Sequence, residues 1–192
     1  MGLGIIKILK GIQVFWNVNE FGIRKKLLGF ENANAFLRKL DKCSMIPILK
    51  KNGAIIGINC DIEAPLIFHN CQNFSNLVVG NNCHIGKNCF FDLCDKVVIN
   101  ENVVISMQST FITHLDMNKS ELHFLFPASH APIYVGKNTY IGTNSTILQG
   151  VILSESCFLA AGSVVTKGVP SFTMVGGVPA KFIKVISRPD FY

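Results

Sequence analysis

The sequence has little charge and lacks the marks of several protein classes. Only 16% of its 192 residues are charged, with 18 Lys and Arg against 12 Asp and Glu, which gives a net charge of +6. A hydrophobic share of 49% excludes a disordered chain and predicts a domain with a buried core. No apolar run approaches the ~20 residues of a membrane-spanning helix. The scattered basic residues are weak evidence for nucleic acid and fit a small polyanionic ligand equally well, so we expect no nucleic-acid partner.

Disulfide and zinc patterns are also missing. The seven cysteines are odd in number and include no C-x-x-C pair, so we expect reduced thiols in a cytoplasmic protein and no metal site. Four of them recur at the small position of the repeat described below, where a free thiol serves as a compact buried apolar group: Cys60, Cys83, Cys89 and Cys157.

Residues 1–51 lack the order of a secretory signal, because Lys7 and Lys10 interrupt the apolar stretch from Met1 to Trp16. We expect a helical or irregular region here, with a second periodic stretch from Ala33 to Leu40. Four apolar residues at helical spacing favour packing against the core: Ile5, Ile8, Leu9 and Ile12. The alternative is a helix in weak contact with a membrane surface, which would place the protein at the periphery of the inner membrane.

A six-residue period governs the rest of the chain. Aliphatic residues fall at every sixth position from Val135 to Val165, namely Val135, Ile141, Ile147, Leu153, Leu159 and Val165. A mostly small residue follows each after four positions, namely Thr139, Ser145, Val151, Cys157, Ser163 and Val169. Such a repeat places an aliphatic side chain inside and then turns a corner, so that three sides close one coil. We therefore predict an all-β fold of stacked parallel coils over residues 52–184, with a C-terminal tail at 185–192.

The period is interrupted once, by a loop insertion at residues 115–132. A long excursion from a regular solenoid is usually functional, because the repeats do not need it. His114 stands at the root of this loop, with Asp116 two positions later, and is a candidate general base. His123 and His130 lie within the loop, and we expect them to line a pocket for a substrate.

Several motifs make the resemblance specific. They are F-I-T-H-L-D, P-I-Y-V-G-K-N-T-Y-I-G, T-I-L-Q-G-V, A-A-G-S-V-V-T-K-G-V-P and V-G-G-V-P-A-K-F-I, in this order between Val79 and Lys184. The chain resembles the hexapeptide-repeat O-acetyltransferases of galactosides, maltose and capsular sugars. This resemblance implies a left-handed parallel β-helix that assembles as a homotrimer. It also implies acetyl-CoA as the acyl donor and a hydroxyl of a sugar or polysaccharide precursor as the acceptor.

The resemblance also assigns roles to individual residues. His114 matches the general base, and the backbone N–H of Thr143 matches the donor to the oxyanion, with the two residues coming from adjacent protomers. Asp92 matches a position that is often an Asn that orients the acceptor; a substrate-binding role and a corner-capping role both stay open. Asp116, His123 and His130 are further candidates for the acceptor site. Coenzyme A contacts are expected from Thr143, Ala161, Thr166, Lys167, Lys181 and Lys184, of which the lysines suit its phosphates.

Two other functions share this scaffold. An N-acyltransferase of an amino-sugar nucleotide is the nearest rival, but an amine needs less help from a base than a hydroxyl does, so His114 favours O-acylation. A zinc lyase like the gamma-class carbonic anhydrases needs three converging imidazoles, and His84 and His114 have no nearby third partner at matching spacing.

Overall fold

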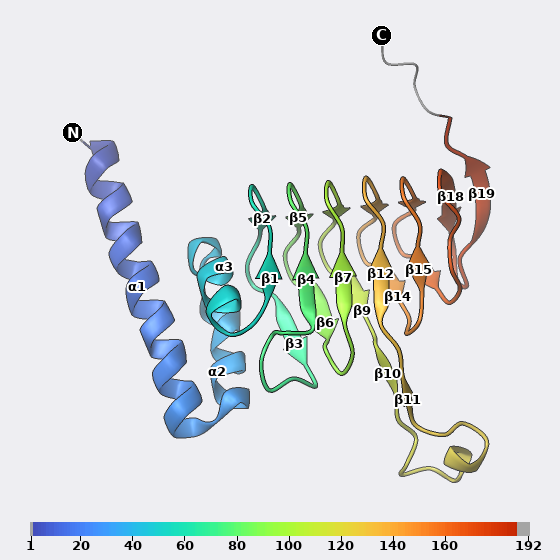
Figure 1. Cartoon of the computed structure of the whole chain (residues 1–192), viewed down its shortest axis with the longest axis horizontal. Helices are drawn as coiled ribbons and strands as arrows, with labels where there is room; N and C mark the ends of the chain where they lie inside the picture. The colour runs from blue at the N-terminus through green and yellow to red at the C-terminus, as the bar shows by residue number, and fades with distance from the viewer. Residues whose placement is uncertain (1, 188–192) are drawn as a thin grey trace.

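A computed structural model describes residues 2–187 and places three helices ahead of a stack of short strands (Figure 1). The helical part comprises α1 (Gly2–Leu28), α2 (Phe30–Phe36), the 3-10 turn η1 (Leu37–Lys39) and α3 (Lys42–Lys51). The side chain of Asp41 caps α3 by accepting the N–H groups of Cys43 and Ser44. Of the tail expected at 185–192, residues 188–192 lie outside the described residues.

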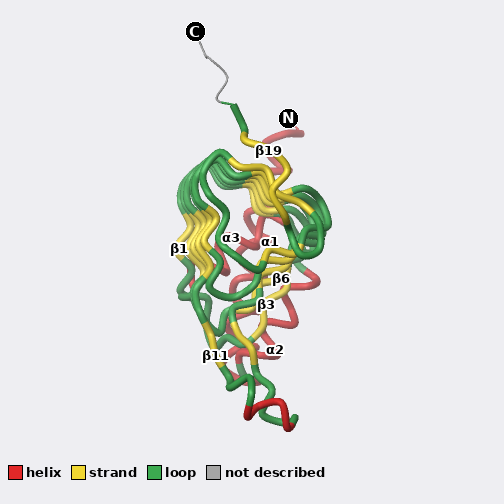
Figure 2. Tube along the Cα trace, turned by 90° about the vertical axis from the view of Figure 1, so that its right-hand side faces the viewer, coloured by secondary structure: helices red, strands yellow, loops and turns green. Residues whose placement is uncertain are grey.

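The strands form three parallel sheets, which we call A, B and C and which the chain visits in turn. Sheet A holds β1 (Ile55–Ile56), β4 (Leu77–Val79), β7 (Val97–Ile99), β12 (Ile133–Val135) and β15 (Ile152–Leu153). Sheet B holds β2 (Asp61–Ile62), β5 (His84–Ile85), β8 (Val104–Ile105), β13 (Tyr140–Ile141), β16 (Phe158–Leu159), β18 (Thr173–Gly176) and β19 (Lys181–Val185), of which β19 alone is antiparallel. Sheet C holds β3 (Ile67–His69), β6 (Phe90–Asp92), β9 (Thr110–Phe111), β14 (Thr146–Ile147) and β17 (Val164–Val165). Figure 2 shows the coils nearly superimposed, which confirms the predicted β-helix of hexapeptide repeats.

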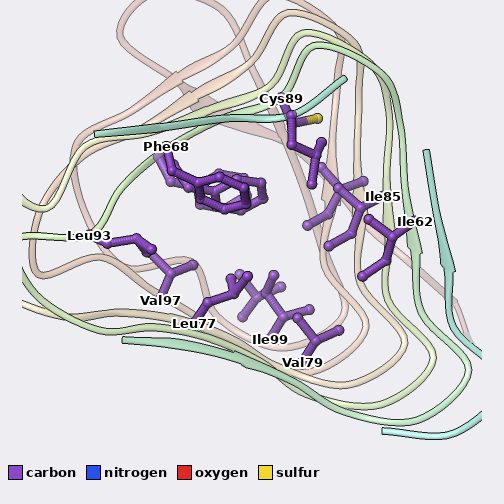
Figure 3. Packing of buried hydrophobic residues seen from close by; sticks show 14 of the residues in the cluster. Ile62, Phe68, Leu77, Val79, Ile85, Cys89, Leu93, Val97 and Ile99 are labelled. Carbon is purple, nitrogen blue, oxygen red and sulfur yellow. The ribbon is translucent and has the colours of Figure 1, made fainter. Parts of the chain in front are cut away.

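The repeat supplies the core. All six aliphatic residues of the period from Val135 to Val165 are at most 1% exposed. Parallel pairing places equivalent residues above one another, so Phe68, Phe91 and Phe111 stack on three successive coils, with ring centroids 5.7 and 4.9 Å apart (Figure 3). Cys83, Cys89 and Cys157 are buried and Cys60 is partly buried; all four thiols are free. Burial raises the pKa of the Cys89 and Cys157 thiols to about 11, so both stay protonated at neutral pH.

The turns between sheets fix the corners of the coil. Asparagines take the left-handed conformation at these turns, at Asn59, Asn82, Asn102, Asn138 and Asn144 among others. Asparagine tolerates this conformation better than other non-glycine residues, which explains its recurrence in the period. Equivalent asparagines also bond to one another: Asn59 Nδ2 donates to Asn82 Oδ1 at 2.9 Å, and Asn82 Nδ2 donates to Asn102 Oδ1 at 3.2 Å.

The prediction that the apolar side of the first helix packs against the core is wrong for this chain. Ile5, Ile8, Leu9 and Ile12 are 49–64% exposed. A different side of α1 faces the domain: Gln13 and Asn17 donate hydrogen bonds to the carboxylate of Asp41, and Phe21 is fully buried. The stretch from Ala33 to Leu40 is helical, as expected, and Ala33, Leu37 and Leu40 are buried.

The insertion leaves the solenoid after sheet C and projects from it (Figure 1). It contains β10 (His114–Leu115), the 3-10 turn η2 (Glu121–Phe124) and β11 (Ser129–His130). β10 and β11 pair in antiparallel fashion, with His114 opposite His130. A histidine thus lies at each end of the insertion, and the two histidines, His114 and His130, are adjacent across the β10–β11 pair.

Candidate active site

His114 is held by a buried carboxylate from the neighbouring coil. Its Nδ1 lies 2.6 Å from Oδ2 of Asp92, the last residue of β6. Because an ionised carboxylate only accepts hydrogen bonds, Nδ1 carries the hydrogen and Nε2 keeps its lone pair. The His114 side chain is 30% exposed, whereas that of Asp92 is fully buried. The arrangement presents one basic nitrogen at the surface in a fixed orientation.

Asp92 is saturated by donors from the protein. Its Oδ2 also accepts the Thr113 N–H and the Thr113 hydroxyl, each at 2.8 Å, and its Oδ1 accepts the Asn70 amide at 3.0 Å. Burial acts to raise the pKa of Asp92, but the hydrogen bonds from His114, Thr113 and Asn70 outweigh it and hold the pKa below its ordinary value. Of the two roles left open for Asp92, full burial favours the corner-capping role over a direct contact with an acceptor.

Asn70 is the third member of this group, and sequence reasoning missed it. It follows β3, one coil before Asp92, and its amide nitrogen lies 3.2 Å from His114 Nε2. Asn70, Asp92 and His114 thus come from three successive coils at the turns that join sheet C to sheet A, which we call the C–A corner. The only available signal was its place at the end of an earlier repeat, with no motif around it.

A second imidazole lies beside the first. His130 faces His114 across the β10–β11 pair, and its Nδ1 lies 2.8 Å from Oδ2 of Asp95. The N–H of Asp95 in turn donates to the hydroxyl of Thr113, the residue that also contacts Asp92. The two histidine–carboxylate pairs are therefore linked through one threonine.

The other two loop candidates bond within the loop itself. Oδ1 of Asp116 accepts the N–H of Asn118 at 2.8 Å, and Nδ1 of His123 donates to the Ser120 carbonyl at 2.7 Å. Both side chains bond only to near neighbours in sequence among the contacts recorded for the described residues. The structure brings His130 to His114, but not Asp116 or His123.

A polar hollow of about 310 Å³ borders Asn70 between α2 and the end of β3. It is lined by Glu31, Asn34, Phe68, His69, Asn70, Cys71 and Gln72. The side chain of Asn34 is fixed there because its amide donates to the Phe68 carbonyl at 2.8 Å. The N-terminal helices therefore contribute to the surroundings of His114, which the sequence did not indicate.

Thr143 lies at a different corner of the coil. It occupies the turn from β13 to β14, at what we call the B–C corner, and its carbonyl accepts the N–H of Gly162 from the next coil at 2.8 Å. Thr146 pairs with Thr110, so Thr143 and His114 are seven positions apart along sheet C, or roughly 20 Å at 3.3 Å per residue. One chain does not bring the two residues together. Within the described chain, the N–H of Thr143 makes no hydrogen bond to the backbone.

The six residues expected to contact coenzyme A lie in three different parts of the β-helix. Thr143 and Ala161 stack at the B–C corner, where a Cβ on Gly142 would lie 2.6 Å from the Ala161 nitrogen. Thr166, Lys167 and Lys181 line a hollow near the C-terminal end, which also includes Phe182. Lys184 lies on β19, where it pairs with Met174. The structure thus brings Lys167 and Lys181 together but separates them from Thr143.

Potential metal ligands do not form a cluster in the described residues. Among residues 2–187, no group of three or more His, Cys, Asp or Glu is placed to hold a metal ion. His84, the second histidine of a zinc-lyase interpretation, lies on β5 with its Nδ1 3.1 Å from Asp61. It belongs to sheet B and does not converge with His114.

Comparisons with known proteins agree with this geometry. The family described as "Hexapeptide repeat of succinyl-transferase" matches residues 76–107 and 132–167. The galactoside O-acetyltransferase of Escherichia coli strain K12 is 28% identical over 183 residues, which covers 89% of this chain and 82% of that relative. A 2,3,4,5-tetrahydropyridine-2,6-dicarboxylate N-acetyltransferase of Enterococcus faecalis is 47% identical, but only over 60 residues, which is 31% of this chain and 26% of its own length.

A solved structure of a galactoside acetyltransferase in complex with coenzyme A superimposes with a TM-score of 0.70 at 25% identity, covering 88% of this chain and 82% of the other. The repeat, the parallel coils and these similarities agree, and the chain is similar in sequence and in fold to the hexapeptide-repeat acyltransferases.

Proposed function

We propose that this protein transfers an acetyl group from acetyl-CoA to a hydroxyl of a sugar or polysaccharide precursor. The observation that carries the proposal is the His114–Asp92 pair, because a hydroxyl is a weak nucleophile and needs a base held in position. Coenzyme A in the galactoside acetyltransferase structure and the similarity to that enzyme support the donor. The cytoplasm, where acetyl-CoA is made available, is the location we propose.

The reaction follows from the orientation of the imidazole. Nε2 of His114 takes the proton of the acceptor hydroxyl, and the oxygen attacks the thioester carbonyl carbon. The Asn70 amide lies where such a hydroxyl would approach, which shows that a hydrogen-bond donor fits there. The Thr143 N–H stabilises the oxyanion, and collapse of the tetrahedral intermediate releases the ester and the coenzyme A thiolate, which takes the proton from His114. The buried charge of Asp92 stabilises the imidazolium between these two transfers.

The site requires two chains. Because His114 and Thr143 of one chain are roughly 20 Å apart, we propose a homotrimer in which the C–A corner of one protomer faces the B–C corner of the next. In this arrangement the thioester lies between Thr143 of one protomer and His114 of its neighbour. Three-fold closure repeats the same contact at each of the three interfaces.

The acceptor is proposed to bind in the polar hollow beside Asn70. Its lining of amides and one carboxylate, with the ring of Phe68, suits a ligand rich in hydroxyl groups. His130 is proposed to contact the acceptor from the other side of His114, with Asp116 and His123 of the loop further out.

The test of the proposed function is a screen of sugars and oligosaccharides as acceptors with acetyl-CoA, followed by release of free thiol. Ester formation on a sugar hydroxyl, identified by its loss in mild base, supports the proposal. Transfer only to amino sugars would favour the N-acyl alternative, which the short match to an N-acetyltransferase represents. Thiol release that depends on no acceptor would contradict both.

Replacing Asp92 with Asn should lower kcat by roughly 10- to 100-fold and leave the KM for acetyl-CoA unchanged. The amide oxygen can still accept from His114, but the negative charge that stabilises the imidazolium is lost. The matched control is Asp95→Asn, which removes the carboxylate of His130 and should have a smaller effect on kcat. Equal effects of the two variants would contradict the assignment of His114 as the base.

The same variant has an expected pH signature. Because the folded pKa of Asp92 is lowered, its ionisation stabilises the native state above the unfolded pKa of about 3.9, and this contribution is lost as pH falls through the folded pKa. The free energy of unfolding of the wild type should therefore exceed that of Asp92→Asn at neutral pH, and the difference should narrow below about pH 4. Denaturant titrations at several pH values measure it.

Lys167 and Lys181 are proposed to bind the phosphates of coenzyme A. Replacing both with Ala should raise the KM for acetyl-CoA about 5- to 30-fold with little change in kcat, because the lysines contact ground and transition states alike. The effect should be small with an acyl-pantetheine donor, which lacks the 3′-phosphate and adenine. The control is Lys50→Ala with Lys51→Ala, two adjacent lysines on α3 outside the hollow. A similar loss with both donors would assign the lysines to stability instead.

A further inference from the structure

The outermost element of the protein is an amphipathic helix whose apolar side faces away from the domain. α1 forms the end layer next to α2 and α3 (Figure 1). A line of four side chains on α1 contacts the domain: Gln13 and Asn17 bond to Asp41, Phe21 is fully buried, and Lys25 bonds to Asn52, while Val18 and Arg24 beside this line contact the core and α2. The four residues of the line are spaced four apart, so they mark the side of α1 that faces the domain.

Eight of the exposed large apolar residues of α1 lie on the other side and are 49–72% exposed: Ile5, Ile8, Leu9, Ile12, Phe15, Trp16, Ile23 and Leu27. Two more, Ile6 and Leu28, are exposed on the same side as the line that meets the domain. At 100° per residue the eight fall within an arc of about 120°, centred about 160° from the line of Gln13, Asn17, Phe21 and Lys25. We call this arc the outer face of α1. An ordered apolar face of this length is unusual on a free soluble surface and indicates something that covers it.

The charge of the helix identifies what covers it. α1 carries five basic side chains, Lys7, Lys10, Arg24, Lys25 and Lys26, and one acidic side chain, Glu20, which pairs with Arg24. Lys26 lies on the outer face itself, beside Ile23 and Leu27. A second protein packed there would remove this ammonium from water without a partner, whereas a lipid interface leaves it among phosphates.

A second copy of α1 is a poor fit for the same reason. Two outer faces packed together would bury Lys26 of each copy among apolar side chains without an acidic partner. Trp16 and Phe15 are aromatic residues of the kind that favour the boundary between headgroups and acyl chains. None of the helices in the part of the chain that the structure describes is suited by length and hydrophobicity to cross a bilayer.

We propose that the outer face of α1 binds the surface of a membrane rich in anionic lipid, with the helix axis in the plane of the interface. The apolar residues enter the boundary with the acyl chains, Lys26 lies near the phosphates, and the net positive charge of the helix attracts the anionic surface. The rest of the domain stays in water, because the opposite side of α1 is its attachment to α2 and α3. This inference does not depend on the acyl acceptor, and its test uses no activity measurement.

Co-sedimentation with vesicles tests it. The full chain should bind vesicles with 30% phosphatidylglycerol in phosphatidylcholine, bind pure phosphatidylcholine at least about tenfold more weakly, and dissociate as salt rises. The triple variant Ile8→Ser, Ile12→Ser and Phe15→Ser should lose binding. The variant Lys7→Gln with Lys10→Gln should bind roughly 5- to 30-fold more weakly.

The matched control removes exposed apolar side chains elsewhere. Phe124→Ser with Leu125→Ser deletes two residues of the insertion that are 79% and 74% exposed, and it should leave vesicle binding unchanged. Light scattering of each variant reports its oligomeric state and circular dichroism reports its fold. Absence of wild-type binding to anionic vesicles would overturn the proposal. So would a triple variant that dissociates into smaller oligomers while the wild type ignores vesicles, since the outer face would then join copies of this chain.

Discussion

Replacing His114 with Ala is expected to lower kcat for acetyl transfer by roughly 10²- to 10⁴-fold while the binding of coenzyme A is nearly unchanged. The reason is the position of Nε2, which keeps its lone pair because Nδ1 donates to Asp92, and which lies at the surface with the Asn70 amide as its neighbour at 3.2 Å. Initial rates with saturating acetyl-CoA measure the effect on kcat, and calorimetric titration with coenzyme A measures binding.

Two further observations distinguish a base from a structural residue in this variant. Added imidazole should restore part of the lost rate, because the deleted side chain leaves a space that opens to solvent at the C–A corner. The midpoint of thermal unfolding should change little, since His114 is partly exposed. Near-normal turnover without His114 would remove the base assignment and favour acylation of an amine.

Replacing Thr143 with Pro is the second change with a large expected effect, a loss of about 10²- to 10³-fold in kcat. Asn144 has a positive φ of 58°, so Thr143 precedes a left-handed residue, as the first central residue of a type II turn does. Proline is favoured at that position, and the N–H it removes has no backbone acceptor within the described chain. The change therefore deletes one donor and leaves the turn in place.

The control for this change is Thr143→Ala, which keeps the N–H and should retain most of the activity. Mixing subunits extends the test to assembly. If His114 and Thr143 act across an interface, trimers reassembled from equal amounts of His114→Ala and Thr143→Pro chains should recover about a quarter of the wild-type sites, because some interfaces combine two intact residues. No recovery in verified mixed trimers would place both residues in one chain's site.

The fold was largely predictable because its information is local. The six-residue period identifies the inward-facing side chain within each repeat. The parallel pairing of successive coils follows from the repeat itself, so no information from residues far apart in sequence is needed to predict it. The helices were less predictable, since periodicity shows that α1 has an apolar side but not which side meets the domain. Gln13 and Asn17 decide that orientation through Asp41, a contact 24 to 28 positions away in sequence.

The site was predictable in part. His114 stands next to the break in the period, so its place in the sequence already marked it. Asn70 and Asp95 carry no such mark, because their importance arises only when coils stack and place them beside a histidine. The expected role of Asp92 depended on a matching position, whereas its burial depends on the donors of Thr113, which only the folded chain assembles.

The insertion between β9 and β12 also bears on how this protein can change over evolution. Ile133 pairs with Val97, 36 positions earlier, whereas Val97 itself pairs with Leu77, 20 positions earlier. Loop-closure entropy grows only with the logarithm of length, so the longer connection destabilises the stack by about 0.5 kcal/mol relative to an ordinary coil. Residues there can lengthen, shorten or diverge with little threat to folding, while the coils beneath keep the reactive groups in place. A lineage of such proteins can therefore vary the part of the proposed acceptor site next to His130 by loop replacement, while the hollow beside Asn70 stays unchanged.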